Sequence, residues 1–563
     1  MTVRLVNDYS SQQTCRRWFN SIPSWEWVAC DVETSGLDPW NEKLRLVQFG
    51  TQTDAWAIPF PAERQLLTDL FARQRQLVGW NSKFDEQFLL NNGFEPNFTD
   101  DARVMAHLLF SEQDLHLKSF ADTHLGADSS TADKERAAAF RKGKWTWGTV
   151  PYDCYEWWYY GGMDTMLTAR AAAYLYPQVV ERGYDDHYQL ELDVWHLITE
   201  AERRGICVDL EYCQEQQEKL EHDAAVIQSY YPDIPLGGRK KLTEHLLEAG
   251  VKLKKTEKGA PSIDEDSLKE SGHPMADDIL KWRSLMKNAH TYFAAFRRIA
   301  VDGRIHTTLK TMEARTGRMS SSIPNLQNVP KREAGAYVRR AFMSSPGCTF
   351  VFADFAQIEY RIFAAKCGEQ KMIDAFLRGE DMHEVTARMT YGRDVTKHER
   401  DVGKNSNFTE LYLGGLEKFA DTAGITLDEA KRFKIMYHRE FPRVKPYTKA
   451  FIRYIQANLF QFENIFGRRI GVDADKPYAG VNYDIQGTAA DVMKRGVVRL
   501  GQTQWGKYLV LLVHDEYILD VPDALVDQCV KELPGILEDH ASFSVPLLVD
   551  VSTAKRWGEP EEA

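Results

Sequence analysis

Two acidic residues far apart in the chain each follow a short apolar run. Asp354 comes directly after the run from Thr349 to Ala353. Asp515 lies just beyond the run from Leu509 to Val513. Short apolar runs of this kind predict buried strands. Carboxylates at the ends of neighbouring strands can hold two divalent cations, which clamp the attacking and leaving oxygens of an in-line phosphoryl transfer. The two positions therefore predict a site for phosphoryl transfer.

A segment between these two positions carries cations and aromatic rings at every fourth residue. They are Arg400, Lys404, Phe408 and Tyr412. Residues spaced by four share one face of a helix. A planar guanidinium and a compact ammonium on that face suit a triphosphate, and the rings beyond them could stack on a base. The segment therefore predicts a helix that binds a nucleotide.

The N-terminal part holds a second group of acidic residues. Asp31 and Glu33 lie at the end of a strand expected from Trp25 onwards, and alternate strand residues share a face. Asp85 follows, and then Asp164, four residues after Tyr160. Four converging carboxylates repel one another unless cations neutralise them. They therefore predict a second two-metal site, suited to hydrolysis.

Taken together, these segments resemble DNA polymerase family A, the DNA polymerase I-like enzymes. The polymerase segments are similar to the family's motifs A, B and C, in the family's order. The N-terminal segments are similar to those of DEDDy 3′–5′ exonucleases. The resemblance covers nearly the whole chain from Ala29 onwards, and it is phage-type, lacking the 5′ nuclease domain.

The resemblance implies a multidomain α/β and α+β fold. A ribonuclease H-like 3′–5′ exonuclease domain would be followed by a right-hand polymerase with thumb, palm and fingers. The expected ranges are 1–183 for the exonuclease domain, 184–302 for the thumb, 303–370 for the first part of the palm, 371–470 for the fingers and 471–563 for the second part of the palm.

The resemblance also implies roles for the polymerase residues. Asp354 and Asp515 would bind metal and act in catalysis, with Glu516 beside them. Glu359 would exclude ribonucleotides by blocking the sugar 2′ position. Further contacts to the incoming nucleotide are expected from His383, Arg400, Lys404, Phe408 and Tyr412.

The run from Thr316 to Pro330 is the longest match to the family. Its Gly, Pro and polar amides make poor core material and suit a loop along a duplex. The contacts to DNA that the resemblance implies are from Arg318, Asn325, Gln327, Asn482, Gln486 and His514. Such contacts favour geometry over base sequence.

In the exonuclease domain the resemblance implies metal binding by all four acidic residues, with Tyr160 orienting or activating the water. These ligands are Asp31, Glu33, Asp85 and Asp164. Each active site would use two Mg²⁺ ions, for which Mn²⁺ could substitute.

The implied function is template-directed DNA synthesis with 3′–5′ proofreading, in phage DNA replication. The partners would be primer–template DNA and deoxynucleoside triphosphates, and we expect a monomer. No apolar run reaches the length of a membrane span, and no secretory signal begins the chain. We therefore expect a cytoplasmic protein, in the host cytoplasm if a phage encodes it.

Three other functions stay open. The chain could be a 3′–5′ exonuclease with a degenerate polymerase domain that only grips DNA, or a DNA-binding scaffold without activity. Both are opposed by the intact acidic residues. A single-subunit RNA polymerase would share the palm, but Glu359 would crowd a 2′-hydroxyl.

The bulk composition sets only wide limits. A chain of 563 residues is too long for a single core. Its net charge of −12 argues weakly against nucleic-acid binding, but a local basic surface suffices for that, and residues 239–258 are locally basic. The sequence departs from the family at Thr409 and Leu413, where Gly is preferred, at Tyr478, where Arg is usual, and at Leu512, where Gln is usual.

Overall fold

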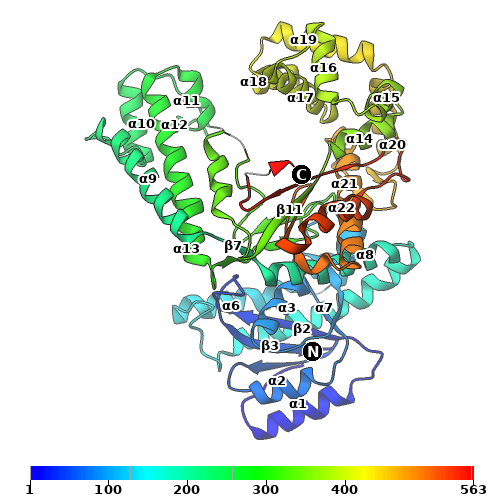
Figure 1. Cartoon of the computed structure of the whole chain (residues 1–563). Coiled ribbons are helices and arrows are strands. Elements are labelled where there is room, and N and C mark those ends of the chain that lie inside the picture. The colour runs from blue at the N-terminus through cyan, green and yellow to red at the C-terminus, as the bar shows by residue number, and fades with distance from the viewer. Residues whose placement is uncertain (1, 127–128, 257, 332, 559–560, 563) are drawn as a thin grey trace.

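The computed structural model describes residues 2–126, 129–256, 258–331, 333–558 and 561–562. An N-terminal region lies below a central sheet in the view of Figure 1. Two helical lobes rise on either side of that sheet, one formed by residues 210–299 and the other by residues 370–457. This arrangement leaves the central sheet between the lobes.

The N-terminal region is a mixed six-stranded sheet covered by helices. The strand order is β1-β4-β3-β2-β5-β6, in which β3 is antiparallel to both neighbours and the other pairs are parallel. The strands are β1 (Thr2–Leu5), β2 (Val28–Thr34), β3 (Leu44–Gly50), β4 (Asp54–Pro59), β5 (Leu77–Gly79) and β6 (Phe98–Asp101). The helices are α1 (Tyr9–Ser21), α2 (Arg64–Phe71), α3 (Ser82–Asn91), α4 (Ala102–Phe110), α5 (Leu117–Phe120), α6 (Ser130–Gly143) and α7 (Tyr155–Glu181).

Strand β2 begins three residues later than the sequence predicted. The Glu26 N–H donates to the Pro23 carbonyl in a turn, and Trp25 is 81% exposed. The turn keeps this large apolar side chain out of the sheet, although its type favours a strand. As a result the strand extends to Thr34 and contains both Asp31 and Glu33.

The first lobe is joined to the N-terminal region by α8 (Asp185–Arg204). Its helices are α9 (Leu210–Ser229), α10 (Arg239–Glu248), α11 (Glu265–Ser271), α12 (Pro274–Lys287) and α13 (Ala295–Ile299), and β7 (Ile206–Cys207) pairs with β8 (Arg304–Ile305) at its base. The tip of the lobe has a small apolar core of its own, in which Leu242, Leu246 and Leu268 are fully buried. The locally basic segment 239–258 contributes the first two of these leucines.

The central sheet is antiparallel throughout, in the order β14-β15-β11-β16-β17. Its strands are β11 (Cys348–Phe355), β14 (Leu509–Val513), β15 (Glu516–Pro522), β16 (Val549–Ala554) and β17 (Glu561–Glu562), and a hairpin of β9 (Thr308–Lys310) and β10 (Ser320–Ser322) lies outside it. Alternate residues of β11 serve two cores. Val351 and Ala353 belong to the core shared with α14 (Ile358–Cys367), α21 (Ala479–Gly501) and α22 (Val526–Leu537). Phe350 and Phe352 belong to the core shared with α9.

The second lobe is helical. It contains α15 (Gln370–Leu377), α16 (Met382–Tyr391), α17 (Lys397–Leu411), α18 (Leu416–Ala423), α19 (Leu427–Glu440) and α20 (Val444–Ala457), followed by a hairpin of β12 (Gln461–Glu463) and β13 (Arg469–Gly471). Helix α17 begins with a capping box of Thr396 and Glu399, which satisfies free N–H groups at its start. This fixes where the predicted nucleotide-binding helix begins.

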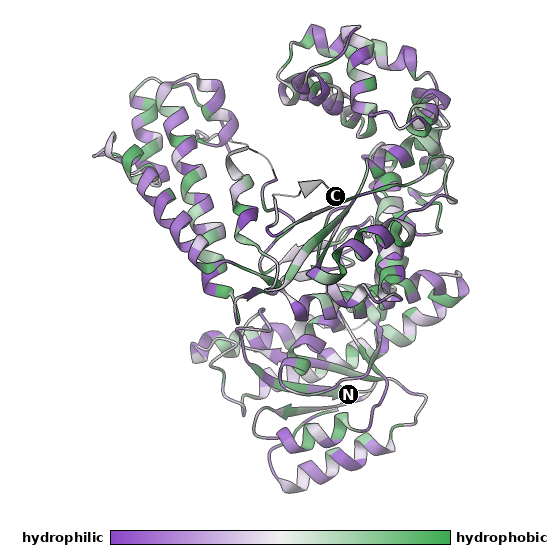
Figure 2. Ribbon diagram, viewed as in Figure 1, coloured by the Kyte–Doolittle hydropathy of each residue, from purple (hydrophilic) through white to green (hydrophobic). Residues whose placement is uncertain are grey.

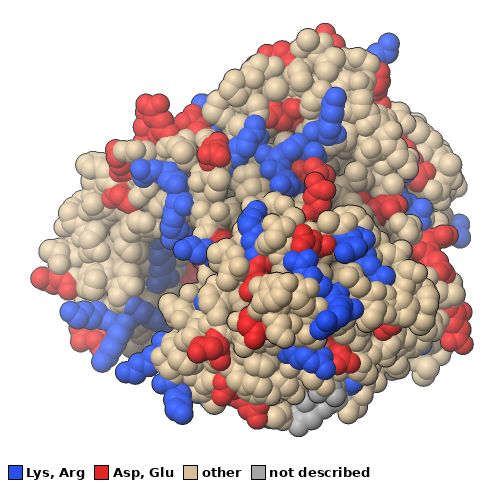
Figure 3. Space-filling model, turned by 90° about the horizontal axis from the view of Figure 1, so that it is seen from below, with Lys and Arg blue, Asp and Glu red and all other residues tan. Residues whose placement is uncertain are grey.

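The surface is mixed in polarity. Hydrophilic and hydrophobic residues alternate along the helices of both lobes in Figure 2, as expected for helices with one buried face. Lys and Arg form several local groups among Asp and Glu on the face shown in Figure 3, so the negative total hides positive patches. Among the described residues, no helix combines the length and the apolar character that crossing a membrane would require.

Candidate active sites

The central sheet gathers acidic residues from separate parts of the chain. The strand register places Asp354 opposite Glu516 on β15 and opposite Asp550 on β16. Asp515 lies in the two-residue turn between β14 and β15, and its carbonyl accepts the Phe355 N–H at 3.2 Å. His514, the other turn residue, has a φ of 57°, in the left-handed region that tight hairpin turns use. The predicted metal ligands therefore lie at the end of β11 and in the turn that leads into its neighbour β15.

The acidic residues of this group disfavour each other's charge. Burial raises the pKa of Asp354 to about 6, and Asp515 adds to that shift, whereas Lys331 opposes it. Burial also raises the pKa values of Asp515 and Glu516. The Lys331 Nζ lies 3.5 Å from Asp354 Oδ2, and Asp354 Oδ1 is buried without a hydrogen-bond partner in the described structure. Clustered oxygen ligands that lack neutralising partners fit a hard divalent cation.

A cavity of about 300 Å³ adjoins the acidic group. Its walls come from five separate segments, and seven of the predicted site residues line it: Arg318, Glu359, His383, Phe408, Tyr412, His514 and Asp515. Gln357, Ile358 and Tyr360 complete the lining. The structure thus brings together side chains up to about two hundred positions apart in the sequence.

Glu359 connects two sides of this cavity. Its Oε2 accepts a hydrogen bond from the Tyr412 hydroxyl at 2.8 Å. Its Oε1 lies 3.2 Å from Arg318 Nη2, and the residue is only 9% exposed. The carboxylate is therefore held in place from two directions.

The predicted helix face is present in α17. Tyr412 caps the helix rather than lying inside it, and its ring stacks on Phe408 with centroids 5.7 Å apart. Lys404 Nζ lies 5.8 Å from the centre of the Phe408 ring. Arg400 is bound to Asp381, with an Nε–Oδ2 distance of 3.0 Å. A triphosphate would have to compete with this carboxylate for the guanidinium.

His383 lies beside the same helix and is neutral at physiological pH. Burial lowers its pKa to about 4, against the opposing effect of Asp381. Asn407 Nδ2 lies 3.0 Å from His383 Nδ1, so the amide can donate to that nitrogen and leave Nε2 to carry the proton. The ring can therefore offer one N–H to a phosphate oxygen.

The remaining predicted DNA contacts lie in different settings. Asn325 is exposed, and its Oδ1 accepts the Asn328 N–H at 3.1 Å. Gln327 is buried and donates to the Leu512 carbonyl at 3.3 Å, so its amide supports β14. Asn482 and Gln486 are half-buried on α21, and Asn482 Oδ1 has no hydrogen-bond partner within the described residues.

The N-terminal sheet gathers the second acidic group. Asp31 and Glu33 lie on β2, and the Asp85 carboxylate at the start of α3 accepts the Val32 N–H at 2.9 Å. Helix α7, which carries Tyr160 and Asp164, packs against β2. A Cβ atom on Gly161 would clash with Gln48 Nε2 and lie 3.1 Å from Glu33 Oε1, so glycine allows α7 to pack closely against β2 and β3.

Burial and mutual repulsion again oppose ionisation. Burial raises the pKa of Asp31 to about 7 and the pKa values of Glu33 and Asp85 well above their usual range, and Asp31 adds to both. Burial, together with Glu33 and Asp31, raises the pKa of Tyr160, which therefore remains a neutral phenol. A buried group of carboxylates such as this also fits divalent cations.

Among the described residues, there is no group of three or more His, Cys, Asp or Glu side chains already placed to hold a metal ion. The two-metal expectation at each site therefore stays a prediction, supported by the chemistry of the donors.

The sequence did not point to several charged neighbours of both sites. Lys331 and Asp550 flank Asp354. Lys118 forms an ion pair with Asp164, and Arg136 lies over the Tyr160 ring at 4.9 Å. None of these four belongs to a motif, and only the packing of distant segments brings them to the sites.

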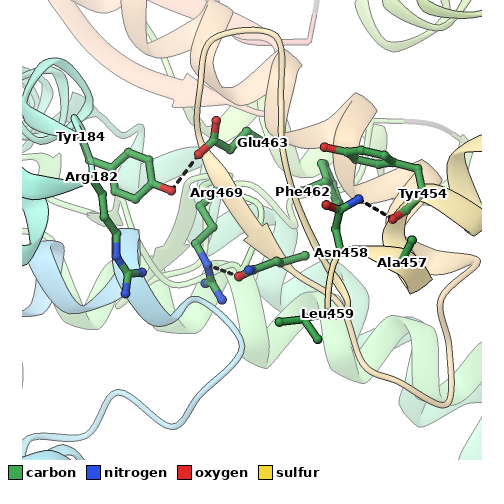
Figure 4. A pocket seen from close by; sticks show the side chains of 10 residues that line it. Arg182, Tyr184, Tyr454, Ala457, Asn458, Leu459, Phe462, Glu463 and Arg469 are labelled. Carbon is green, nitrogen blue, oxygen red and sulfur yellow. Dashed lines mark hydrogen bonds between the residues drawn. The ribbon is translucent and has the colours of Figure 1, made fainter.

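A larger cavity, of about 560 Å³, lies away from both acidic groups. Figure 4 shows it between the α7–α8 turn and the β12–β13 hairpin, with Tyr184 reaching Glu463 across it at 2.9 Å. No residue predicted for either active site lines this cavity. It marks a joint between regions of the molecule.

Comparison with known proteins gives consistent matches over the whole chain. The family model described as DNA polymerase family A matches residues 210–559, and the one described as 3′–5′ exonuclease matches residues 8–179. A DNA polymerase of Mycobacterium phage L5 is 29% identical over 94% of this chain and 93% of its own length. DNA polymerase I of Chloroflexus aurantiacus is 30% identical over 88% of this chain and 56% of its own length.

One solved structure supports the fold. The POL domain of Pol1 from M. smegmatis, in complex with DNA primer–template and dNTP, matches with a TM-score of 0.78 over 99% of both chains, at 24% identity. The family match extends over more than half of the chain, and an exonuclease domain precedes the polymerase domain. The chain therefore belongs to DNA polymerase family A and is a DNA-directed DNA polymerase with a 3′–5′ exonuclease domain.

Proposed function

We propose that the chain extends a primer at the Asp354–Asp515 site and removes mispaired 3′ ends at the site of Asp31, Glu33, Asp85 and Asp164. The observation that carries this proposal is the cavity of about 300 Å³ beside Asp515. Carboxylates, the neutral His383 and two stacked rings border the same space. Such a set suits one nucleotide and its triphosphate.

In the polymerase site, the chain's own groups would orient the reactants. Mg²⁺ held by Asp354 and Asp515 would supply charge neutralisation for the attacking and leaving oxygens, with Glu516 nearby. Arg400, Lys404 and the neutral His383 would bind the triphosphate. Phe408 would stack on the incoming nucleotide, and Tyr412 would lie at the template base.

Glu359 would act on the sugar, because it forms a fixed wall of the cavity. DNA contacts would come from Arg318, Asn325, Asn482, Gln486 and His514. Gln327 would act indirectly, because its amide already supports β14.

In the exonuclease site, the four carboxylates would hold the cations and the neutral Tyr160 would orient the attacking water. The phenol can accept and donate a hydrogen bond without losing its proton. Proofreading at this site would require the primer end to leave the polymerase site and reach the N-terminal region.

The relatives support a proposal for the wider setting. A phage DNA polymerase matches almost end to end. We therefore place the protein in phage DNA replication in the host cytoplasm, acting as a monomer on primer–template DNA with deoxynucleoside triphosphates and Mg²⁺, for which Mn²⁺ could substitute.

A recessed, labelled primer–template with Mg²⁺ tests both sites at once. Wild-type protein should extend the primer with deoxynucleotides and shorten it without them. Asp354→Ala should reduce extension by more than about a hundredfold, beyond the usual cost of weakening a metal site, and leave shortening intact. Asp31→Ala should do the reverse. The activity that each variant keeps shows that the variant is folded.

Retained extension in Asp354→Ala would overturn the assignment of the polymerase site. Retained shortening in Asp31→Ala would overturn the exonuclease site. Shortening without any extension by the wild-type protein would instead favour an exonuclease whose polymerase domain only grips DNA.

A further inference from the structure

Two cationic side chains, Lys118 and Arg136, lie in the exonuclease site, although neither belongs to a motif noted in the sequence. Lys118 is on the short helix α5, and Arg136 is on α6. Both helices precede α7, which carries Tyr160 and Asp164. The two cationic side chains therefore come from elements other than β2 and α3, which carry three of the four acidic residues.

Lys118 contacts both functional residues of α7. Its Nζ forms an ion pair with Asp164 Oδ1 and lies 4.3 Å from the centre of the Tyr160 ring. The Lys118 side chain is 22% exposed, but its Nζ is buried, so the ammonium itself is shielded from water. A long, flexible ammonium in this position can change partners without moving the backbone.

Arg136 is held more firmly. Its Nη2 lies 2.6 Å from Asp133, and its guanidinium packs over Trp147 at 4.5 Å and over Tyr160 at 4.9 Å. The side chain is 14% exposed. The Tyr160 ring thus has a fixed cation near it on Arg136 and an adaptable one on Lys118.

The negative charge of the DNA substrate explains why cationic side chains would be useful at this site. The 3′ end of DNA brings a phosphodiester, with its negative charge, towards four carboxylates. Bound metal ions offset part of this repulsion, but the phosphate also has non-bridging oxygens that require partners. The attacking water lies beside Tyr160 in the proposed site, so the phosphorus it attacks must be within reach of groups around that ring.

We propose that Lys118 binds a non-bridging oxygen of the scissile phosphate in the exonuclease site, with Arg136 fixing the Tyr160 ring beside it. Before DNA enters, Lys118 is paired with Asp164. When the 3′ end of DNA enters, the phosphate competes with Asp164 for the ammonium, which turns to the phosphate oxygen. This inference rests on the proposed exonuclease site and adds a substrate-binding residue to it.

Binding of DNA without metal is the direct test, because it separates the contact made by the Lys118 ammonium from metal-dependent catalysis. A single-stranded oligonucleotide with 2-aminopurine as its 3′-terminal base is titrated with protein in EDTA. Lys118→Met should weaken binding by about tenfold or more, the loss expected for one charge-assisted hydrogen bond. Lys118→Arg should restore most of the affinity. Lys142→Met is the matched control, since Lys142 is an exposed lysine on α6.

The same variants are then assayed for shortening across a Mg²⁺ titration. Lys118→Met should raise the KM for single-stranded DNA, with primer extension unchanged as evidence of folding. If Lys118→Met binds the oligonucleotide in EDTA with the same affinity as the wild-type protein, the inference is overturned. So would a lower Mg²⁺ requirement with unchanged KM, which would mean that Lys118 only occupies the place of a metal.

Failure of the inference is distinct from failure of the proposed site. If Asp31→Ala still shortens DNA, the site itself is wrong. If Asp31→Ala is inactive while Lys118→Met binds and cleaves normally, only the role of Lys118 is wrong.

Discussion

The carboxylate of Glu359 has two partners that depend on its charge and length. Tyr412 and Arg318 approach its two oxygens separately. It therefore shapes the cavity directly and also holds a ring and a cation that border the same space. Any substitution at this residue changes both functions unless the size of the side chain is kept.

We predict that Glu359→Ala relaxes the choice of sugar. Loss of the side chain opens room for a 2′-hydroxyl, so discrimination against ribonucleotides should fall by roughly tenfold or more, within the range that steric fit in a pocket provides. Glu359→Gln keeps the size and should retain most of the discrimination. The ratio of kcat/KM for deoxy- and ribonucleotides measures this. An unchanged ratio in Glu359→Ala would contradict the steric role.

For individual residues, the sequence was most informative where the residue belongs to a motif. Asp354, Asp515 and the α17 face lie where the patterns place them. Gln327 shows what a motif leaves open: a contact to DNA stays a prediction there, and the structure adds that its amide donates to the Leu512 carbonyl. The direction of a loop side chain depends on the surface against which the loop packs. No periodicity in the sequence records that surface.

Among the elements, the end of α17 carries an unusual backbone. Leu413 follows the helix cap with a φ of 51°. A left-handed residue is common just after a helix, but it is usually glycine, because a Cβ costs roughly 1–2 kcal/mol there. The departure from the family seen at this position is therefore a departure in backbone energy as well as in side chain.

We predict that Leu413→Gly is more stable than Leu413→Ala by about 1 kcal/mol, since both remove the side chain but only glycine removes the left-handed strain. Thermal unfolding of the two variants measures the difference. Hydrogen exchange of the α17 amides would show whether the gain is local. Equal stability of the two variants would mean that the rest of the lobe already compensates for the strain.

The strands were easier to predict than their arrangement. The run from Leu509 to Val513 is wholly buried and matches β14. The pairing of β11 with β15 joins residues more than 150 positions apart, however, and the sequence alone contains no signal for that register. Similarly, β2 was placed three residues early because Trp25 has the composition of a strand but lies in a turn.

Across the whole molecule, the exonuclease region is joined to the polymerase by charged contacts between distant segments. Arg469 on β13 binds Glu112 through two hydrogen bonds, of 2.9 and 3.0 Å, and its Nε donates to Gln461. A Cβ on Gly471 would clash with Glu112, so the two regions approach closely here. This joint borders the cavity of Figure 4. It therefore helps to hold the exonuclease region against the polymerase region.

We predict that Arg469→Met loosens the joint and lowers the free energy of unfolding by about 1–3 kcal/mol, the usual cost of a hydrogen-bonded charged pair that is shielded from water. Arg453→Met removes an exposed arginine from α20 and should change stability by less than about 0.5 kcal/mol. Urea unfolding measures both variants. A similar small change in the two would mean that the ion pair does not hold the regions together.

The effect of Arg469→Met should also depend on pH in one direction. Burial raises the pKa of Glu112, but Arg469 outweighs burial and leaves that pKa below its usual value. A carboxylate with a lowered pKa stabilises the fold fully above the pKa it has when unfolded, about 4.3, and loses that contribution as the pH falls through the folded value. The gap between wild type and Arg469→Met should therefore stay constant from pH 8 to about 5 and shrink below that. A gap that already closes between pH 8 and 6 would show that a group other than Glu112 carries the contact.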